Sequence, residues 1–393
     1  MICDGAADYP IEALGGKTPL ETANKPTMDA LCKKARVGMV SNVPEGMVPE
    51  SDTANLAILS YDPKIYSKGR SPLEAVSMGI DMKPDETAFR CNVVTLGEEE
   101  GYENKTMIDH SSDEITTYEA DKLIKSLDEA LGDEFKKFYT GVSYRHCLIW
   151  KEAPENVQFM RPHDILGRKI TEYLPPEPFL TLQKKSNEIL EHHPINEERR
   201  ARGLKPANSI WLWSPGKKPA LPSFFDKWGL DGSVISAVDL IKGIGLCAGM
   251  ESIDVEGATG NVHTNYKGKA EAAIEAFKRG KDFVFVHVEG PDECGHRAEL
   301  ENKIISIEKI DAEILKTIVE YLRSTSEDFR VMVLPDHPTP ICTRTHAMNP
   351  VPYMIYASDK EQDSGVEKFC EKDVSENGSY LPNGCELLAF FTE

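Results

Sequence analysis

One segment of the sequence places aspartate and histidine side chains directly after a strand-like apolar run. Residues 331–334 are apolar and valine-rich, and the run stops at a proline followed by Asp336 and His337. His346 follows after a loop that contains a further proline. A carboxylate and two imidazoles in one small volume suit zinc, manganese or a similar divalent ion. The segment predicts a metal site, and an ordinary surface turn is the alternative.

A second segment combines the same residue types. The apolar run 282–288 leads into a turn in which Asp292 and His296 stand four residues apart. This spacing, just past a strand end, is workable for two ligands of one metal ion. Ligands of α/β proteins bind beyond the carboxyl ends of strands, so both segments are expected to contribute to one site.

Two residues near the N-terminus give less specific signals. Asp4 follows a very short apolar run, residues 1–3, and on its own is a turn residue. That run is either a stub of a strand or the remainder of one that starts upstream. Ser51 precedes an apolar helical run. It is either an N-cap or a nucleophile whose phosphoryl group a helix N-terminus would stabilise.

The elements that must position these residues alternate between strands and helices. Strand-like runs at 233–238 and 282–288 are each followed by a helical pattern, and the helix predicted at 300–323 has an isoleucine-rich face. This alternation predicts an α/β fold whose mostly parallel sheet is covered by helices on both faces.

The middle of the chain has a different pattern. Strands at 89–96 and 141–150, with an amphipathic helix at 116–131, predict a smaller α+β domain inserted into the larger fold. The expected boundaries place residues 1–84 and 175–393 in the core domain and residues 85–174 in the insertion.

The segment 153–206 is rich in proline and charge and is expected to bridge back to the core domain, with one helix at 178–192 and with Arg199, Arg200 and Arg202 solvated. The strand at 141–150 carries the basic pair Arg145 and His146. This pair belongs either to a solvated face or to a ligand-binding site.

Composition excludes several classes of function. The 393 residues carry 45 basic and 65 acidic side chains, a formal net charge of -20. So acidic a chain is unsuited to wrapping nucleic acid or to lying on an anionic membrane. No segment approaches the roughly 18 continuous apolar residues of a membrane helix, and no signal peptide is recognisable. The nine scattered cysteines, without a CxxC pair, indicate reduced thiols in a cytoplasmic protein.

Several motifs together resemble a known family. They are the DGAAD string at the N-terminus, the Ser-Asp pair before a helix, HVEGPDECGH, and LPDHPTP followed by RTH. These resemble the alkaline phosphatase superfamily. With GRSPLEA, AFRCN, YRH, ANSIWLW, VISAVDLIKGIG, GATG and TNYKGKA, the chain is similar over nearly its whole length to archaeal-type cofactor-independent phosphoglycerate mutases.

The resemblance implies an alkaline phosphatase-like core and two divalent metal ions, manganese, magnesium or zinc. It implies that one ion is bound by Asp292, His296 and His346, and the other by Asp4, Asp336, His337 and the oxygen of Ser51. Ser51 would be the nucleophile and would carry a phosphoserine intermediate during interconversion of 3-phosphoglycerate and 2-phosphoglycerate, without 2,3-bisphosphoglycerate. The inserted domain would enclose the substrate as a lid. The expected phosphate and carboxylate contacts are Arg145, His146, Arg70, Arg90 and Lys267.

Two positions depart from the family's pattern. The segment 109–114 differs from the family's usual Ser-Ala-Gly-His-like sequence, which leaves a substrate-facing histidine missing or displaced to His110, and His263 stands where aspartate is usual. The alternative function is therefore a related metal-dependent phosphotransferase on another small metabolite, similar to a homoserine kinase, although no P-loop is present. A third alternative is a non-catalytic metal-binding or scaffold protein. The expected partner is a small phosphorylated metabolite, with no nucleic acid and no membrane, and the oligomeric state is left open.

Overall fold

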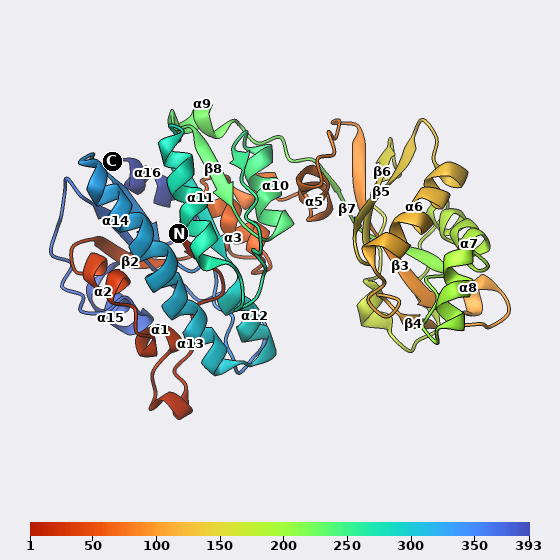
Figure 1. Cartoon of the computed structure of the whole chain (residues 1–393), viewed down its shortest axis with the longest axis horizontal. Helices are drawn as coiled ribbons and strands as arrows, with labels where there is room; N and C mark the ends of the chain where they lie inside the picture. Colours follow the sequence, from red (N-terminus) through yellow and green to blue (C-terminus); the bar gives the residue numbers. More distant parts are fainter. The chain divides into compact units, whose positions relative to one another are not determined.

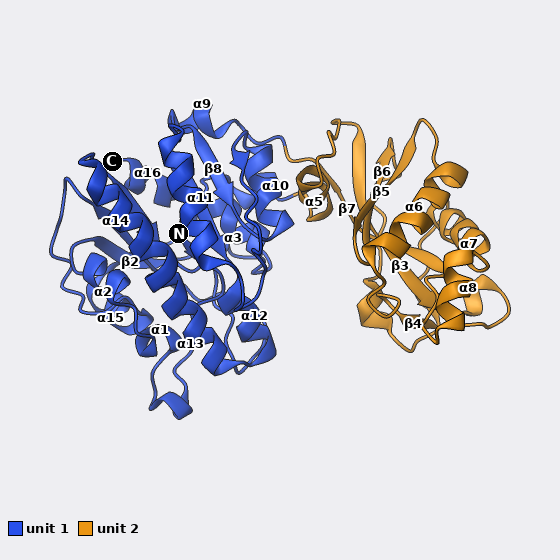
Figure 2. Cartoon of the chain, viewed as in Figure 1, with its two compact units in different colours: residues 1–67, 220–393 blue, residues 68–219 orange.

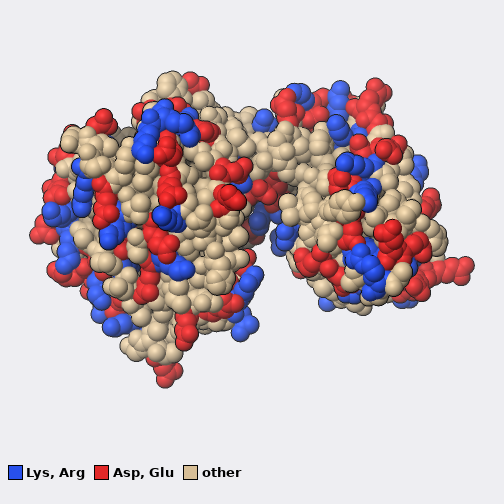
Figure 3. Space-filling view, viewed as in Figure 1, with Lys and Arg blue, Asp and Glu red and all other residues tan.

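The computed structural model describes residues 1–393, and the chain divides into two compact units (Figure 2). Unit 1 comprises residues 1–67 and 220–393, and unit 2 comprises residues 68–219. On the visible face, acidic and basic side chains are interspersed over both units (Figure 3). No helix in the structure combines the length and the apolar composition needed to cross a membrane.

Unit 1 is built around a mostly parallel sheet (Figure 1). Its first four strands lie in the order β1-β10-β8-β9 and are all parallel. The other four lie in the order β11-β12-β2-β13, in which β12 alone runs antiparallel to its neighbours. The strands are β1 (Ile2–Cys3), β2 (Arg36–Val40), β8 (Gly232–Ile235), β9 (Glu251–Ser252), β10 (Phe283–Val288), β11 (Arg330–Val333), β12 (Val351–Ala357) and β13 (Ser379–Leu381).

A parallel bridge between Ile2 and Leu334 joins the two groups of strands. The strand β1 therefore lies between β10 and β11, in the middle of the sheet. Helices pack against the sheet: α11 contacts β10 and β8, and α15 contacts β2 and β12. The helices that matter below are α3 (Ser51–Ile58), α11 (Tyr266–Lys278), α12 (Gly290–Arg297), α14 (Lys316–Thr325), α15 (Glu371–Asn377) and α16 (Leu387–Thr392). The predicted α/β class with a mostly parallel sheet is confirmed.

The helix expected at 300–323 is present but not uniform. It consists of α13 (Leu300–Lys309), a π-helical segment (Ile310–Leu315) and α14. The π-helical segment holds the buried carboxylate of Asp311, which accepts hydrogen bonds from the backbone N–H groups of Thr27 and Met28 at 3.1 and 2.6 Å. These two groups belong to the first turn of α2 (Pro26–Cys32), where a helix leaves its N–H groups without partners.

Unit 2 is an antiparallel sheet with its three longer helices on one face, while the short helix α5 packs against the other. The long strand β3 pairs with β4, β6 and β7, and β5 pairs with β6. Apolar residues of α6, α7 and α8 form one core with Phe89, Cys91 and Val93 of β3. The elements are α5 (Ser71–Ser77), β3 (Glu86–Leu96), β4 (Met107–Asp109), α6 (Thr117–Leu131), β5 (Lys136–Val142), β6 (Arg145–Lys151), α7 (Phe179–Leu190), α8 (Pro194–Ala201) and β7 (Ser209–Lys217).

The boundaries of the two units correct the expected ones. The divisions fall at residues 67/68 and 219/220 instead of 84/85 and 174/175. The reason is strand pairing: β7 pairs with β3 from Val94 to Thr87, and α7 packs on β7. The segment expected to be a bridge to the core, residues 153–206, thus lies wholly within unit 2. Pairing across a long sequence separation leaves no local signal, so sequence composition marked the boundary in the wrong place.

Arg199 of α8 is a second correction, because it is buried rather than solvated. Only 1% of its surface is exposed, and its guanidinium donates to Glu119 at 2.9 Å and to the carbonyls of Ser112 and Lys205 at 2.6 and 2.9 Å. Arg202 reaches the other oxygen of Glu119 at 3.0 Å, but its own side chain is 54% exposed. One carboxylate therefore has a buried and a solvated arginine partner.

This difference predicts unequal effects on stability. Arg199→Met leaves Glu119 and two carbonyls without their buried donor, and we expect it to lower the free energy of unfolding of unit 2 by about 3 kcal/mol. Arg202→Met removes only a solvated ion pair and should cost about 0.5 kcal/mol. Urea denaturation followed by circular dichroism measures both. Equal losses in the two variants would contradict the assignment of Arg199 as a buried cross-link.

Candidate metal centre and nucleophile

Three neighbouring strands of unit 1 end at the same edge of its sheet, and each is followed by an acidic residue. Asp4 follows β1, Asp292 lies in α12 just after β10, and Asp336 comes shortly after β11. Since β1 is parallel to both neighbours, the carboxyl ends of the three strands meet there. The strands thereby bring together residues that are more than 280 positions apart in the sequence.

The first group of donors is formed by Asp292, His296 and His346. The Nε2 atoms of His296 and His346 lie 3.3 and 3.4 Å from the carboxylate oxygens of Asp292 and 3.0 Å from each other. Burial opposes ionisation of Asp292, but hydrogen bonding with the two imidazoles holds its pKa well below the usual value. Two imidazole nitrogens and a carboxylate facing one point form a donor set typical of a transition-metal site.

The backbone fixes which nitrogen each histidine presents. The Nδ1 atom of His296 lies 2.9 Å from the carbonyl oxygen of Arg344, and that of His346 lies 2.6 Å from the carbonyl oxygen of Pro49. A carbonyl only accepts, so each Nδ1 carries the proton and donates it. Without a metal, Nε2 of each imidazole can also be protonated and donate to Asp292; when it is deprotonated, its lone pair is free for a metal ion, which is the arrangement that metal-binding histidines use.

The second group contains Asp4, Asp336 and His337, all at most 2% exposed. His337 Nε2 lies 3.6 Å from an oxygen of Asp4 and from one of Asp336. The Oδ1 atom of Asp4 is buried and has no hydrogen-bond partner. Burial, together with the neighbouring carboxylates of Asp336 and Asp292, raises the pKa of Asp4 well above its usual value.

This concentration of buried negative charge tests whether the residues fit a metal ion. A buried carboxylate oxygen without a donor is costly, and adjacent carboxylates repel each other. The ligand atoms of Asp4, His287 and Asp336 lie within 4.8 Å of one another, and so do those of Asp292, His337 and His346. Each set of three could therefore bind one ion. Oxygen and nitrogen donors with unmet negative charge fit divalent cations.

Ser51 is the first residue of α3, and its hydroxyl points at the second group of donors. The N-cap position is occupied by Glu50, whose side chain makes no cap hydrogen bond. The Oγ atom of Ser51 lies 3.2 Å from Nε2 of His337. Asn55, one turn later, donates to the Ser51 carbonyl at 2.8 Å and to Asp336 Oδ2 at 2.9 Å. The N-cap alternative is therefore wrong, and the serine faces the candidate metal ligands.

Sequence reasoning missed residues that hold the site in place. His287 of β10 is fully buried, with Nε2 3.2 Å from Asp4 and Nδ1 3.3 Å from the hydroxyl of Ser236. Thr339 donates to Asp292 at 2.5 Å. Lys303 of α13 is buried and donates to Asp8 and to the carbonyl of Thr339, both at 2.8 Å. For His287 and Lys303 the only sequence signal was a polar residue in an otherwise apolar strand or helix face, and Thr339, in the loop after β11, gave none.

The expected substrate contacts fall in different places. Arg145 and Arg90 lie on the sheet face of unit 2 against which α5 packs, where Arg90 pairs with Glu74 of α5 and its guanidinium lies 4.7 Å from the ring of Trp213. Arg70 directly precedes α5 of unit 2. Lys267 lies on α11 of unit 1, with its side chain 77% exposed and 3.6 Å from Glu271.

His146 does not suit the expected role. It is 4% exposed, its Nδ1 accepts from the backbone N–H of Gly141 at 3.1 Å, and burial lowers its pKa to about 3. Adjacent residues of a strand point to opposite faces, so Arg145 and His146 cannot share a surface. A neutral, buried imidazole offers no charge to a phosphate.

His110, in the segment that departs from the family's pattern, belongs to a ring cluster in unit 2. Its ring lies 5.6 Å from Tyr144 and 6.0 Å from His163, whose ring lies 5.6 Å from Trp213. The Nδ1 atom of His110 is buried without a hydrogen-bond partner. Together with Arg90 these side chains form a polar and partly cationic surface that sequence reasoning did not assemble.

Comparison with known proteins identifies the family. A sequence profile described as 2,3-bisphosphoglycerate-independent phosphoglycerate mutase matches residues 32–196. The protein of that name from Methanosarcina barkeri is 45% identical over 100% of this chain and 98% of its own. The chain belongs to the 2,3-bisphosphoglycerate-independent phosphoglycerate mutase family. The Methanosarcina mazei member is 46% identical over 99% of this chain and 97% of its own.

Two solved structures match nearly the whole chain, and one of them is a mutase of this family. The cofactor-independent phosphoglycerate mutase from Thermoplasma acidophilum is 25% identical, with a TM-score of 0.66, and the match covers 99% of this chain and 97% of that one. The PH0037 protein from Pyrococcus horikoshii is 28% identical, with a TM-score of 0.81, over 99% and 94% of the two chains. The whole chain, including unit 2, thus follows the family's fold.

The contact between Thr339 and Asp292 predicts a selective effect on metal binding. Thr339→Val removes a buried donor to a carboxylate, and we expect the free energy of unfolding to fall by about 2 kcal/mol. We also expect the affinity of the chelated protein for manganese to fall about tenfold or more, because Asp292 is no longer held in position. Thr343→Val is the control, since that hydroxyl bonds only to carbonyls within its own exposed loop. Calorimetric titration measures the affinity, and equal affinities in the two variants would contradict the positioning role of Thr339.

Proposed function

We propose that this protein interconverts 3-phosphoglycerate and 2-phosphoglycerate through a phosphoserine on Ser51, without 2,3-bisphosphoglycerate. One observation carries the proposal: the hydroxyl of Ser51, at the start of α3, faces His337 within a group of buried carboxylates. Membership of the mutase family supports the choice of substrate.

Two divalent ions would be held by this chain's own side chains. Asp292, His296 and His346 would hold one, and Asp4, Asp336, His337 and the oxygen of Ser51 would hold the other. When bound, such ions lower the pKa of a serine hydroxyl and stabilise negative charge on a transferring phosphoryl group. Protons would compete with a metal ion for His296, because hydrogen bonding to Asp292 raises the pKa of this imidazole to about 9.

The protein's residues orient the transfer. Ser51 Oγ bonds to the phosphorus while the bond from phosphorus to O3 of the glycerate breaks, and the serine proton ends on the released hydroxyl. The backbone N–H groups at the start of α3 face the phosphoryl group there, where the helix dipole favours negative charge. Asn55 donates to both Ser51 and Asp336 and so holds these two residues in position relative to each other during the step. Return of the phosphoryl group to O2 regenerates Ser51 and leaves the overall charge unchanged.

The glycerate must stay bound between the two half-reactions, because water would otherwise hydrolyse the phosphoserine. Unit 2 is proposed to supply the binding groups, as a substrate-binding lid. Arg90, which is paired with Glu74, and Arg145 lie on the sheet face opposite to α6 and α7 and would provide positive charge, and His110 provides a buried nitrogen without a hydrogen-bond partner. Arginine side chains suit carboxylate and phosphate groups because their N–H donors match both oxygens.

The test is an enolase-coupled assay on 3-phosphoglycerate without 2,3-bisphosphoglycerate. Chelation should abolish turnover and added manganese should restore it. Ser51→Ala should lower kcat roughly a thousandfold or more, because the nucleophile is lost. Ser375→Ala is the matched control, since that exposed hydroxyl bonds only to a carbonyl of its own helix.

Turnover retained by Ser51→Ala would contradict the phosphoserine mechanism. A folded, manganese-loaded protein that is inactive on 3-phosphoglycerate but transfers phosphate from ATP to homoserine would replace the mutase by the phosphotransferase alternative. Absence of both activities together with absence of bound divalent ions would favour a scaffold protein.

A further inference from the structure

The loop between two of the candidate metal ligands, His337 and His346, contains an arginine in an unusual backbone conformation. Residues 340–344 form a single turn, in which the N–H of Arg344 donates to the carbonyl of Pro340 at 2.9 Å. Arg344 ends this turn with φ +56°, in the left-handed region. Helical turns commonly end with such a bond and a left-handed residue, and that residue is usually glycine or, less often, asparagine.

An arginine is energetically unfavourable at this position. The Cβ atom of an L-residue crowds the backbone in the left-handed region, and glycine adopts the same conformation at less cost. Eleven non-glycine residues of the chain have a positive φ, and Arg344 is the only basic one among them. The others are serine, alanine, asparagine, aspartate or glutamate. A residue held in such a conformation beside a functional site points to a function that justifies the strain.

The backbone of Arg344 explains the conformation but not the residue type. The left-handed turn aims its carbonyl at Nδ1 of His296, 2.9 Å away, and this contact fixes the orientation of the imidazole ring. Glycine would place the same carbonyl at the same point with less strain. The function that requires arginine must therefore lie in the side chain.

The side chain of Arg344 has no acidic partner. Arg344 is exposed, and its guanidinium makes no hydrogen bond, ion pair or ring contact in the structure. This is unexpected in a chain with 65 acidic and 45 basic side chains. Arg297 of α12, one residue after His296, pairs with Glu293 at 2.9 Å. The donors of Arg344, in contrast, are available to a ligand.

The candidate metal centre is open to solvent on the side where Arg344 lies. The side chains of His296 and His346 are 37% and 17% exposed, whereas those of Asp4 and Asp336 are at most 2% exposed. A substrate must therefore approach the ligands from the side of the two histidines. Arg344 contacts one of these histidines through its carbonyl and precedes the other by two residues.

We propose that Arg344 is a further catalytic residue, whose guanidinium binds the phosphoryl group as this group passes between the substrate and Ser51. The inference rests on the proposed function and adds to it a residue of unit 1 that supplies positive charge. Two N–H groups of a guanidinium match two phosphoryl oxygens, and they stabilise the charge that develops during transfer. Arg344 keeps its protons throughout, so the bonds formed and broken are those of the proposed transfer.

The experiment compares Arg344→Gly and Arg344→Asn with the control Ser326→Gly, all in the full-length, manganese-loaded protein. Glycine and asparagine both tolerate the left-handed conformation, so both variants keep the carbonyl that faces His296 and lose the guanidinium. Ser326 also has a left-handed backbone, with φ +60°, and is exposed at the end of α14.

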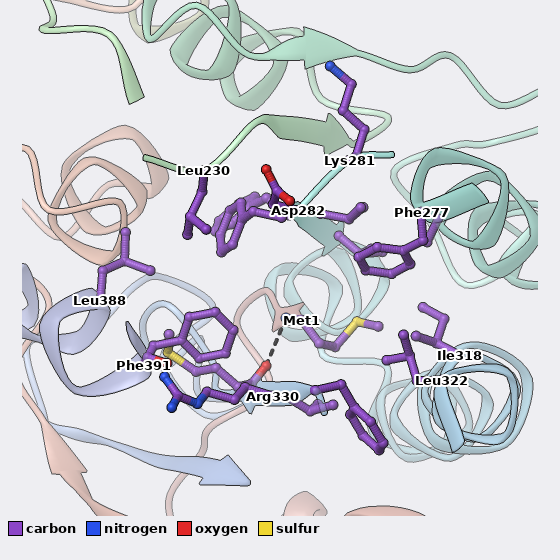
Figure 4. Close-up of a pocket in the computed structure, with 18 of the residues that line it drawn as sticks. Met1, Leu230, Phe277, Lys281, Asp282, Ile318, Leu322, Arg330, Leu388 and Phe391 are labelled. Carbon is purple, nitrogen blue, oxygen red and sulfur yellow. Dashed lines mark hydrogen bonds between the residues drawn. The ribbon is translucent and has the colours of Figure 1, made fainter. Parts of the chain in front are cut away.

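The control position lies away from the metal centre. Ser326 shortly precedes β11, whereas Asp336 follows the carboxyl end of this strand. Figure 4 shows Ile318 and Leu322 of α14 at the apolar pocket near the amino end of β11, where Arg330 begins the strand. Relief of strain at Ser326 should therefore change stability without changing ligand binding.

Both glycine substitutions should raise the melting temperature by about 2 °C, because they relieve backbone strain. The two Arg344 variants alone should weaken the binding of inorganic phosphate, about tenfold or more by calorimetric titration, because the phosphate loses a charged pair of donors. They should also lower kcat on 3-phosphoglycerate about a hundredfold, while their affinity for manganese stays that of the parent.

Phosphate affinity and kcat equal to those of the parent in Arg344→Asn would overturn the proposal. A loss of manganese affinity as large as the loss of kcat would also overturn it, because the residue would then act by positioning His296. Weaker binding of D-glycerate with unchanged binding of phosphate would overturn the phosphoryl assignment in favour of the carboxylate. A parent protein without mutase turnover would refute the proposed function, and the phosphate titration would still decide whether Arg344 binds a phosphoryl group.

Discussion

The structure of unit 1 depends on one electrostatic constraint: carboxylates of like charge are buried together at the carboxyl edge of its sheet. Asp4, Asp292 and Asp336 are each at most 6% exposed. Their mutual repulsion and loss of hydration disfavour the folded chain unless positive charge is placed among them. The histidines around them supply part of that charge, and divalent ions would supply the rest. The repulsion among these carboxylates is relieved when a cation binds between them. The folded chain therefore binds cations strongly at this site.

Neutral and cationic groups behind the carboxylates prevent the loops from relaxing apart. Lys303 ties Asp8, which follows the first strand, to the carbonyl of Thr339, which follows β11. Gly5 has φ +62°, and a Cβ atom there would lie 2.6 Å from the Cα of Asp292. The loops after β1 and β10 can approach so closely only because this residue is glycine. Cross-links and close approach of backbone therefore hold the like charges together.

Much of the site was predictable because strand ends in a parallel sheet share one edge. The apolar runs 331–334 and 282–288 predicted buried strands. The structure places the acidic and histidine residues that follow these strands side by side. His287 and Lys303 could not be predicted in the same way. Each is one polar residue in an apolar pattern, and only the fold shows that Asp4 and Asp8 are their partners.

Predictions failed where long-range pairing decides the outcome. The boundary of unit 2 depends on β7 joining β3, which no local pattern reveals. His146 was grouped with Arg145 because they are adjacent in sequence, yet strand alternation places them on opposite faces. Arg199 was expected to be solvated because its neighbours are charged, whereas the fold places Glu119 against it. The elements were also incomplete: the strand expected at 141–150 is the end of β5 and most of β6, and α8, which carries Arg199, was not expected.

The most direct test of this account is the effect of Asp4→Asn on the metal-free and the manganese-loaded protein. If buried like charges are held for cation binding, the substitution should raise the melting temperature of the chelated protein, because it removes repulsion. It should also remove one of the two proposed manganese ions per chain at saturation. A chelated variant that is less stable than the parent, with two ions still bound, would contradict the central claim.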